Sequence, residues 1–247
     1  MEKNDIVFNN TPRETEISPA LLAALENAAL PERVKLSIQS AAKNNDAFVS
    51  RLRFILKKDP YLWILVDKEH PLPPDYSPGD LVELMNASYR VGRNGMPLRK
   101  TAALSLEDMA AAAKNAGLTL VASSAYRSYD YQAGVYERNV AQMGREAADR
   151  ESARPGHSQH QLGLVVDFGS ITDAFALTAE GQWLASNASN FGWSLSYPEG
   201  YEDITGYRWE SWHYRYVGDD LSSFIDDYFE GIQQYALRFI LEWTLIN

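Results

Sequence analysis

The chain has 247 residues, of which 45% are hydrophobic, so it can bury a packed core. Its formal net charge of −10 argues against a nucleic-acid partner, because phosphate binding relies on clustered lysine and arginine. The absence of cysteine excludes disulfides and thiolate ligands, so a zinc site here must use histidine and carboxylate.

The compartment stays open at this stage. No apolar run approaches the roughly 20 residues that a membrane-spanning helix needs, so we expect no transmembrane segment. The N-terminus begins Met1-Glu2-Lys3-Asn4-Asp5 and continues with polar sequence, unlike a signal peptide. The chain is therefore either a cytoplasmic protein or a mature exported protein that has lost its leader.

The first 60 residues predict a helical extension without a chemical motif. Helical patterns begin at Ser18-Pro19 and at Pro31, where proline suits the first turn, and the last helix of the segment ends at Asp59-Pro60. We therefore expect two parts, an N-terminal helical extension over residues 1–60 and a domain over residues 61–247 that carries the chemistry.

The middle of the chain alternates apolar runs with turn-forming residues, which predicts strands and helices joined by loops. In chain order we expect a strand at 62–66, an extended Pro-rich loop at 71–80, a helix at 105–116, a strand at 118–123, a turn at 126–128, a helix from there to about Met143, and a mobile loop at 144–156.

The last third predicts further strands and helices. They are a buried strand opened by Gly163 with Asp167 near its exit, a helix around 178–190 capped by Thr178, aromatic-rich strands at 192–197 and 207–217, and two short closing helices. Strands and helices do not alternate as a doubly wound sheet requires. We therefore expect an α+β fold with a small, mostly antiparallel sheet flanked by helices.

Residues with metal-binding chemistry fall in two short stretches. Asp167 follows the apolar run 164–166, and a buried carboxylate needs a partner, of which a metal ion is one. A single histidine is more often a satisfied polar residue than a ligand, so the prediction depends on the set. His160, Asp167 and His213 offer zinc three protein ligands and leave the fourth position open, as in catalytic zinc sites.

Glu210 lies three residues before His213. On an extended segment the two side chains face opposite sides, so they meet only if a bulge or turn intervenes. With such a turn, Glu210 can accept a proton from an attacking water and pass it to the leaving amine. The alternative is a surface glutamate before a buried Trp212.

Several other polar residues are candidates for the site. Arg127, between a strand end and a helix start, can steady an oxyanion or bind a terminal carboxylate, or it can stack on nearby tyrosines. Ser158 and Gln132 are candidates for substrate binding, although each could equally serve as a cap or a solvated side chain. We leave His157 outside the metal shell and expect His70 to be structural.

Three motifs, found in one order along residues 61–218, resemble the signatures of the zinc D-alanyl-D-alanine carboxypeptidases of the VanY type. They are Tyr126-Arg127-Ser128 with Gln132, then Ser158-x-His160-x-x-Gly163-x-Val165-x-Asp167, and then Glu210-x-Trp212-His213, with further landmarks at 65–73 and 197–207.

The resemblance implies a role for each site residue and a fold like that of the Hedgehog signalling domain and these peptidases. Zinc would be held by His160, Asp167 and His213. Glu210 would be the catalytic base and Arg127 would stabilise the oxyanion. The substrate would be bound by Ser158, Gln132, Tyr126 and Trp212.

The implied substrate is a peptidoglycan stem peptide that loses its C-terminal D-alanine. Such enzymes work outside the cytoplasmic membrane, which favours a mature exported protein whose leader was removed. Three alternatives stay open: an L,D-carboxypeptidase acting on the tetrapeptide, an endopeptidase that cuts cross-links, and a non-catalytic cell-wall-binding module. The sequence does not fix the oligomeric state.

Overall fold

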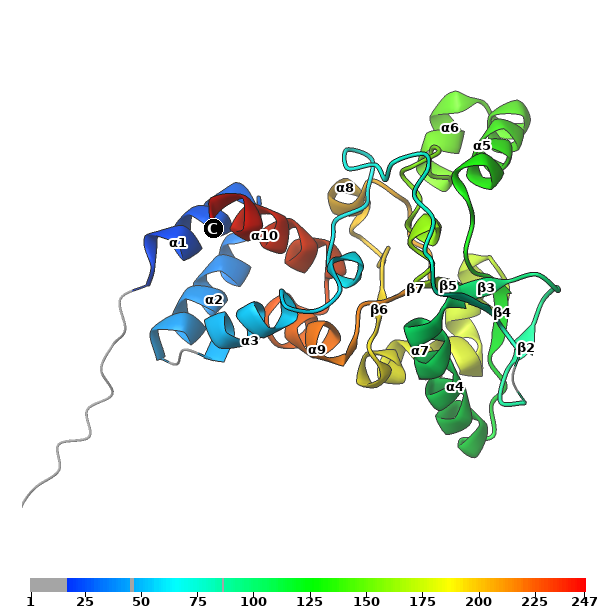
Figure 1. The fold of residues 1–247 in the computed structure, drawn as a ribbon, viewed down its shortest axis with the longest axis horizontal. Coiled ribbons are helices and arrows are strands. Elements are labelled where there is room, and N and C mark those ends of the chain that lie inside the picture. The colour runs from blue at the N-terminus through cyan, green and yellow to red at the C-terminus, as the bar shows by residue number, and fades with distance from the viewer. Residues whose placement is uncertain (1–16, 45–46, 86) are drawn as a thin grey trace, which may run out of the picture.

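A five-stranded sheet carries the predicted site, and a two-stranded ribbon lies beside it (Figure 1). The computed structural model describes residues 17–44, 47–85 and 87–247. The strands are β1 Leu81–Glu83, β2 Arg90–Val91, β3 Pro97–Arg99, β4 Val121–Ser124, β5 Val165–Phe168, β6 Trp193–Leu195 and β7 His213–Tyr216.

Most of the strand pairs are antiparallel. The larger sheet has the order β2-β4-β5-β7-β6, in which only the β2–β4 pair is parallel, and β1 pairs with β3 in the ribbon. This confirms the expected α+β class with a small, mostly antiparallel sheet. Strand β5 lies in the middle of the sheet and all its residues are buried, which explains its continuous apolar run.

The register around β5 brings distant parts of the chain together. Asp167 on β5 lies opposite Ser124 of β4 on one side and His213 of β7 on the other. The prediction of a strand with Asp167 near its exit is confirmed. Because β5 is central, its neighbours on both sides contribute to whatever surrounds this carboxylate.

Helices surround the sheet. They are α4 Lys100–Asn115, α5 Tyr129–Met143, α6 Arg145–Glu151, α7 Ala179–Asn187 and α8 Glu202–Thr205. Thr178 caps α7 as predicted, because its hydroxyl accepts a hydrogen bond from the backbone nitrogen of Gly181 at 3.0 Å. Helix α4 and the sheet share a hydrophobic core, which includes Leu106 of α4, Phe168 of β5 and Trp193 of β6.

The N-terminal and C-terminal helices share a second hydrophobic core (Figure 1). This group consists of α1 Pro19–Asn27, α2 Glu32–Asn44, α3 Ala47–Ile55, α9 Asp219–Tyr228 and α10 Gln233–Ile246. The ring of Phe48 lies 5.0 Å from that of Phe224 and 5.6 Å from that of Phe239. A division at residue 60 remains a prediction, but the first three helices pack against the last two.

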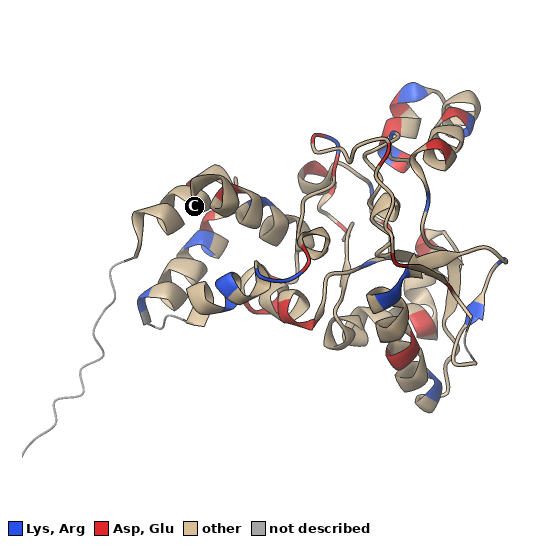
Figure 2. Cartoon of the chain, in the orientation of Figure 1, with Lys and Arg blue, Asp and Glu red and all other residues tan. Residues whose placement is uncertain are grey.

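Lysine and arginine are interspersed with acidic residues over both parts of the chain (Figure 2). None of the described helices is long and apolar enough to cross a membrane.

The predicted strand at 62–66 is wrong. Residues Pro60–Leu62 form a 3₁₀ turn, and the chain continues without regular structure. Arg215 of β7 is fully buried, and its Nη2 donates to the carbonyl oxygens of Tyr61, Leu62 and Ile64 at 3.0, 3.3 and 2.9 Å. These carbonyls therefore bind a guanidinium instead of a neighbouring strand.

The predicted loop at 144–156 is also wrong in its first half, because residues Arg145–Glu151 form helix α6. Ala148 of this helix is buried, and Arg150 makes a bidentate ion pair with Glu202 of α8 at 2.6 and 2.8 Å. These contacts, which lie far apart in sequence, hold as helix a segment whose mixed charges suggested a loop.

Candidate metal and catalytic site

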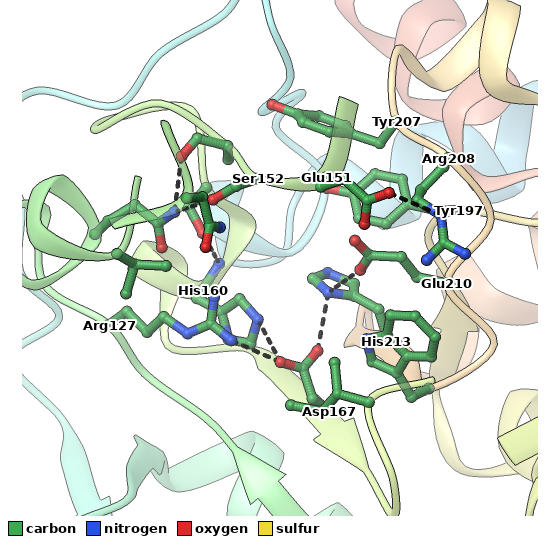
Figure 3. Close-up of a pocket in the computed structure, with 17 residues that line it drawn as sticks. Arg127, Glu151, Ser152, His160, Asp167, Tyr197, Tyr207, Arg208, Glu210 and His213 are labelled. Atoms are coloured by element: carbon green, nitrogen blue, oxygen red, sulfur yellow. Dashed lines mark hydrogen bonds and ion pairs between the residues drawn. The ribbon is translucent and has the colours of Figure 1, made fainter. Parts of the chain in front are cut away.

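A cavity of about 240 Å³ beside β5 collects most of the predicted site residues (Figure 3). It lies where the loop after β4, the turn before β5 and the start of β7 meet. The predicted residues that line it are Arg127, Gln132, Ser158, His160, Asp167, Glu210, Trp212 and His213.

Asp167 lies between the two histidines (Figure 3). Its Oδ2 is 3.1 Å from His160 Nε2 and its Oδ1 is 3.1 Å from His213 Nδ1, and one ligand atom from each residue lies within 4.8 Å of the others. All three side chains are buried. Two imidazoles and one carboxylate at this spacing can hold a divalent metal ion, as the sequence pattern predicted.

One oxygen atom of the three proposed metal ligands lacks a hydrogen-bond partner among the described residues. Asp167 Oδ1 is buried and makes no hydrogen bond with any described residue, because its contact with His213 Nδ1 lacks hydrogen-bond geometry. A buried acceptor without a partner is costly, and a cation satisfies it. The residues therefore fit a metal ion.

Hydrogen bonds orient the two imidazoles. His160 Nδ1 lies 2.6 Å from the carbonyl oxygen of Ala125, so this nitrogen carries the proton and Nε2 faces Asp167 with its lone pair. His213 is turned the other way, with Nε2 at 3.4 Å from Gln159 Oε1 and Nδ1 toward Asp167. Such outer hydrogen bonds are typical of histidine ligands to metals.

The local sequence explains how His160 reaches Asp167. Residues Gln159–Leu162 form a 3₁₀ turn, and Ser158 caps it by accepting a hydrogen bond from the backbone nitrogen of His160 at 3.3 Å. Gly163 ends the turn in a left-handed conformation, with φ of +66°, and the chain then enters β5. The predicted turn-plus-strand is confirmed.

A turn also joins Glu210 to His213. The backbone nitrogen of His213 donates to the carbonyl oxygen of Glu210 at 3.2 Å, and β7 begins only at His213. The strand predicted over 207–217 is therefore wrong in its first half. The turn puts both side chains on one side, with Glu210 Oε2 at 3.3 Å from His213 Nδ1.

Burial and neighbouring charges shift the proton affinities of the site. Burial raises the pKa of the Glu210 carboxyl. Burial also lowers the pKa of His160 to about 4, helped by the positive charge of Arg127. For His213 burial acts in the same direction, but the carboxylates of Asp167 and Glu210 beside its Nδ1 outweigh burial and raise its pKa to about 9. Burial opposes ionisation of Asp167, yet the two histidines and Arg127 hold its pKa well below the usual range.

Arg127 closes one side of the site. Its Nη2 donates to Asp167 Oδ2 at 2.7 Å, and its Nε donates to Ser124 Oγ at 3.0 Å. The guanidinium lines the cavity, so it can present further N–H groups to a bound carbonyl or carboxylate.

Three of the four predicted substrate contacts, Gln132, Ser158 and Trp212, line the cavity. Gln132 Nε2 donates to the carbonyl oxygen of Ala153 at 2.7 Å, while its Oε1 is buried without a partner among the described residues. Tyr126 lies apart from them. Its hydroxyl is 3.1 Å from Ser77 Oγ, and it does not line the cavity.

The other two histidines, His70 and His157, contact Asp67 and do not belong to the group formed by His160, Asp167 and His213. His70 Nδ1 lies 2.7 Å from Asp67 Oδ1, and His157 Nδ1 lies 2.8 Å from the carbonyl oxygen of Asp67. This agrees with leaving His157 outside the metal shell and with expecting a structural role for His70.

Sequence reasoning missed several residues that line the cavity. Tyr197, Tyr207 and Arg208 come from the segment between β6 and β7, and Glu151 comes from the end of α6. Tyr197 packs against His213, with ring centroids 4.7 Å apart. The aromatic content of residues 192–217 predicted only strands, and the family landmark at 197–207 came without a role for any of its residues.

Comparisons with known proteins point to one family. The family model described as VanY, D-alanyl-D-alanine carboxypeptidase, matches residues 95–219. YodJ of Bacillus subtilis (strain 168) is 36% identical over 208 residues, covering 81% of this chain and 76% of YodJ. A D-alanyl-D-alanine carboxypeptidase of Enterococcus faecium is 31% identical over 162 residues, covering 63% of this chain and 50% of that protein.

Solved structures give the same result. The LdcB LD-carboxypeptidase superposes with a TM-score of 0.64 at 36% identity, covering 71% of this chain and 89% of that one. The D,D-pentapeptidase VanY from a VanB-type resistance cassette, solved as a mutant in complex with Zn(II), has a TM-score of 0.58 at 31% identity and covers 70% of this chain and 96% of that one.

Proposed function

The chain belongs to the VanY family of D-alanyl-D-alanine carboxypeptidases, and we propose that it is a zinc-dependent peptidase that removes the C-terminal D-alanine from peptidoglycan stem peptides. One observation carries the proposal. His160, Asp167 and His213 place their ligand atoms within 4.8 Å of one another, and Glu210 lies beside them in the same cavity.

Zinc would be held by His160 Nε2, Asp167 and His213 Nδ1, the atoms that already face one another. The ion would supply Lewis-acid chemistry, polarising the scissile carbonyl and lowering the pKa of water so that hydroxide is available to attack it. The same ligand set accepts other divalent ions, so zinc is favoured by the Zn(II) complex of the related VanY structure.

Glu210 is the proposed proton carrier. Its Oε2 faces the cluster, and burial raises its pKa toward the range in which a carboxyl group both accepts and releases a proton. It takes the proton of the attacking water and then delivers it to the nitrogen of the departing D-alanine. A pure binding module needs no such base, which argues against the non-catalytic alternative.

Arg127 and the polar residues of the cavity are assigned to the substrate. The Arg127 guanidinium donates hydrogen bonds to the carbonyl oxygen as negative charge develops on it. Ser158 and Gln132 bind the terminal carboxylate or amide of the peptide, and Trp212 contributes an apolar wall. Because Tyr126 does not line the cavity, we do not assign it a direct contact.

An L,D-carboxypeptidase is the second candidate. The likeness to LdcB, an LD-carboxypeptidase, at the same 36% identity as YodJ favours it as strongly as the family description favours D,D-activity. Both reactions need the same ligands, base and oxyanion donor, so the choice depends on which residue precedes the scissile bond. An endopeptidase acting on cross-links would use the same set. A peptidoglycan substrate places the activity outside the cytoplasmic membrane.

Mass spectrometry of two defined stem peptides tests the proposal. One peptide ends in D-Ala-D-Ala. The other is the tetrapeptide, in which a single C-terminal D-alanine follows L-lysine or its diaminopimelate equivalent. Purified protein is incubated with each peptide, with chelator, and with chelator followed by excess zinc.

We expect the first peptide to lose one alanine, the chelator to stop the reaction and zinc to restore it. Loss only from the tetrapeptide would make the protein an L,D-carboxypeptidase. Inertness toward both peptides in the zinc-loaded protein would contradict a carboxypeptidase, and cleavage of cross-linked muropeptides would then identify an endopeptidase.

A further inference from the structure

A line of buried hydrogen bonds joins helix α10 to His213. Gln233, in the first turn of α10, donates from Nε2 to Ser196 Oγ at 3.4 Å, and Ser196 donates to Gln159 Oε1 at 2.7 Å. Gln159 Oε1 in turn lies 3.4 Å from His213 Nε2. All four side chains are at most 4% exposed, so water does not compete for these bonds.

The chemistry of the groups fixes the direction of every bond in this relay. An amide nitrogen only donates, so Ser196 Oγ accepts from Gln233 and directs its single proton to Gln159. Gln159 Oε1 can only accept, so the His213 nitrogen that faces it must carry a proton. In the neutral imidazole, the form that binds a metal ion, Nδ1 of His213 then keeps its lone pair toward Asp167.

We propose that Gln233 of α10 is a positioning residue for the metal site, acting on His213 through Ser196 and Gln159. The inference deepens the proposed function and rests on it, because His213 matters in this way only as a metal ligand. Helix α10 lies outside residues 95–219, which the family model matches, and it belongs to the second hydrophobic core. The relay therefore connects the helices of the second hydrophobic core to the proposed metal site.

Burying the Gln233 amide costs stability, so filling space does not explain this residue. Gln233 Nε2 also donates to the carbonyl oxygen of Ser194 at 3.3 Å, but its Oε1 is buried without a partner among the described residues. A buried acceptor left unsatisfied costs stability, and an apolar side chain of the same size would avoid that cost. The hydrogen bond that the amide nitrogen donates to Ser196 Oγ explains why an amide is found at this position.

The neighbouring residue supplies a matched control. Gln234 has the same side chain, lies in the same helical turn and is 3% exposed, but its Nε2 donates to Asp67 Oδ2 at 2.9 Å. No hydrogen bond among the described residues connects its side chain to His213. Its replacement leaves a buried carboxylate short of a hydrogen bond, so it should harm folding at least as much as replacement of Gln233.

The test compares Ser196→Ala, Gln233→Met and Gln234→Met with the wild-type chain. Two properties are measured on folded, metal-free full-length protein: the zinc dissociation constant, by competition with a chromophoric chelator, and the visible absorption spectrum after loading with Co²⁺. Thermal unfolding of the metal-free proteins reports general damage.

We expect Ser196→Ala and Gln233→Met to weaken zinc binding by about tenfold or more, in the range found when outer partners of metal ligands are removed. Both should change the cobalt spectrum, while Gln234→Met should leave affinity and spectrum unchanged. Because the bonds act in series, the double variant Ser196→Ala/Gln233→Met should bind zinc no more weakly than Ser196→Ala alone.

Wild-type affinity and spectrum in Ser196→Ala and Gln233→Met would overturn the positioning role, as would an equal loss in Gln234→Met. If Gln233→Met does not fold, Ser196→Ala decides, since it removes a single oxygen atom. A wild-type protein that binds no zinc would overturn the metal site and the relay together, whereas failure of the relay alone leaves the proposed function intact.

Discussion

Glu210 Oε2 lies 3.3 Å from Nδ1 of His213, although the two residues are separated by only two others at the start of a strand. A hydrogen bond from the backbone nitrogen of His213 to the carbonyl oxygen of Glu210 makes the turn that permits this. A carboxylate proposed to move protons is thereby held against a nitrogen proposed to hold metal. The two roles can be separated experimentally.

Replacing Glu210 with Gln keeps the shape of the side chain but removes its ability to accept a proton. We expect turnover of the cleaved stem peptide to fall by about 10²- to 10⁴-fold while zinc stays bound. Alanine release and metal analysis of the same sample measure both. Glu199→Gln, at an exposed carboxyl between β6 and β7, should behave as wild type. Loss of zinc from folded Glu210→Gln protein would contradict this division of roles.

Arg127 offers a second separation, between the rate of the chemical step and binding. If its guanidinium stabilises the oxyanion, Arg127→Met should lower kcat by about 10²- to 10³-fold with zinc retained, and Arg127→Lys should recover part of the loss because the charge remains. Steady-state kinetics on the cleaved peptide distinguish the roles. A higher KM at unchanged kcat would instead assign Arg127 to the terminal carboxylate of the substrate.

Sequence patterns predicted the parts of the site whose residues are close together along the chain. The Ser158 cap, the turn at His160 and the strand that ends near Asp167 follow one another along the chain, and each has its own signal. The pairing of Asp167 with His213 is not local, since it depends on the register between β5 and β7. Residue chemistry grouped Asp167 and His213 as candidate ligands, and the resemblance of the motifs to a known family supported the grouping, but neither gave the register.

The failures also have a non-local cause. Residues 62–66 have strand-like composition, but Arg215 occupies the carbonyl oxygens that a strand would use. Helix α6 forms where a loop was predicted, with Ala148 buried and Arg150 paired with Glu202, a residue far away in the sequence. The relay from Gln233 to His213 joins four separate segments through amides and a hydroxyl, and no periodic pattern in the sequence predicts it.

Asp67 makes stability depend on pH. Burial alone would raise its pKa, but hydrogen bonds from Glu69, His70 and Gln234 outweigh burial and lower it. A carboxyl whose pKa is lower in the folded state stabilises the fold above its unfolded pKa of about 3.9, and the contribution is lost as pH falls through the folded value. Asp67→Asn should therefore lower the free energy of unfolding at pH 7 by roughly 1–3 kcal/mol.

Urea unfolding of wild type and Asp67→Asn at pH 7, 5 and 3.5 measures this difference. It should be nearly constant between pH 7 and 5 and shrink at pH 3.5. Asp75→Asn, at an exposed carboxyl in the following loop, should change stability little at any pH. A difference that does not vary with pH would mean that Asp67 contributes through packing or neutral hydrogen bonds instead of through its charge.

Gly163 tests the geometry that separates His160 from Asp167. Its φ of +66° disfavours any residue with a Cβ, and an added Cβ would lie 3.0 Å from side-chain atoms of Arg99 and Leu81. Gly163→Ala should therefore lower the free energy of unfolding by roughly 1–3 kcal/mol. It should also weaken zinc binding, because the residue joins the turn that carries one proposed ligand to the strand that carries another.

The control is Gly134→Ala in the interior of α5, where an added Cβ would lie 3.5 Å from the tip of the Arg138 side chain. Alanine favours helix there, so this variant should gain roughly 0.5–1 kcal/mol. Urea unfolding with and without zinc compares the two. If Gly163→Ala matched the wild type in both stability and zinc affinity, the left-handed turn would not be what sets the spacing of the ligands. Loss of stability with full zinc affinity would show that the two ligands keep their positions despite strain between them.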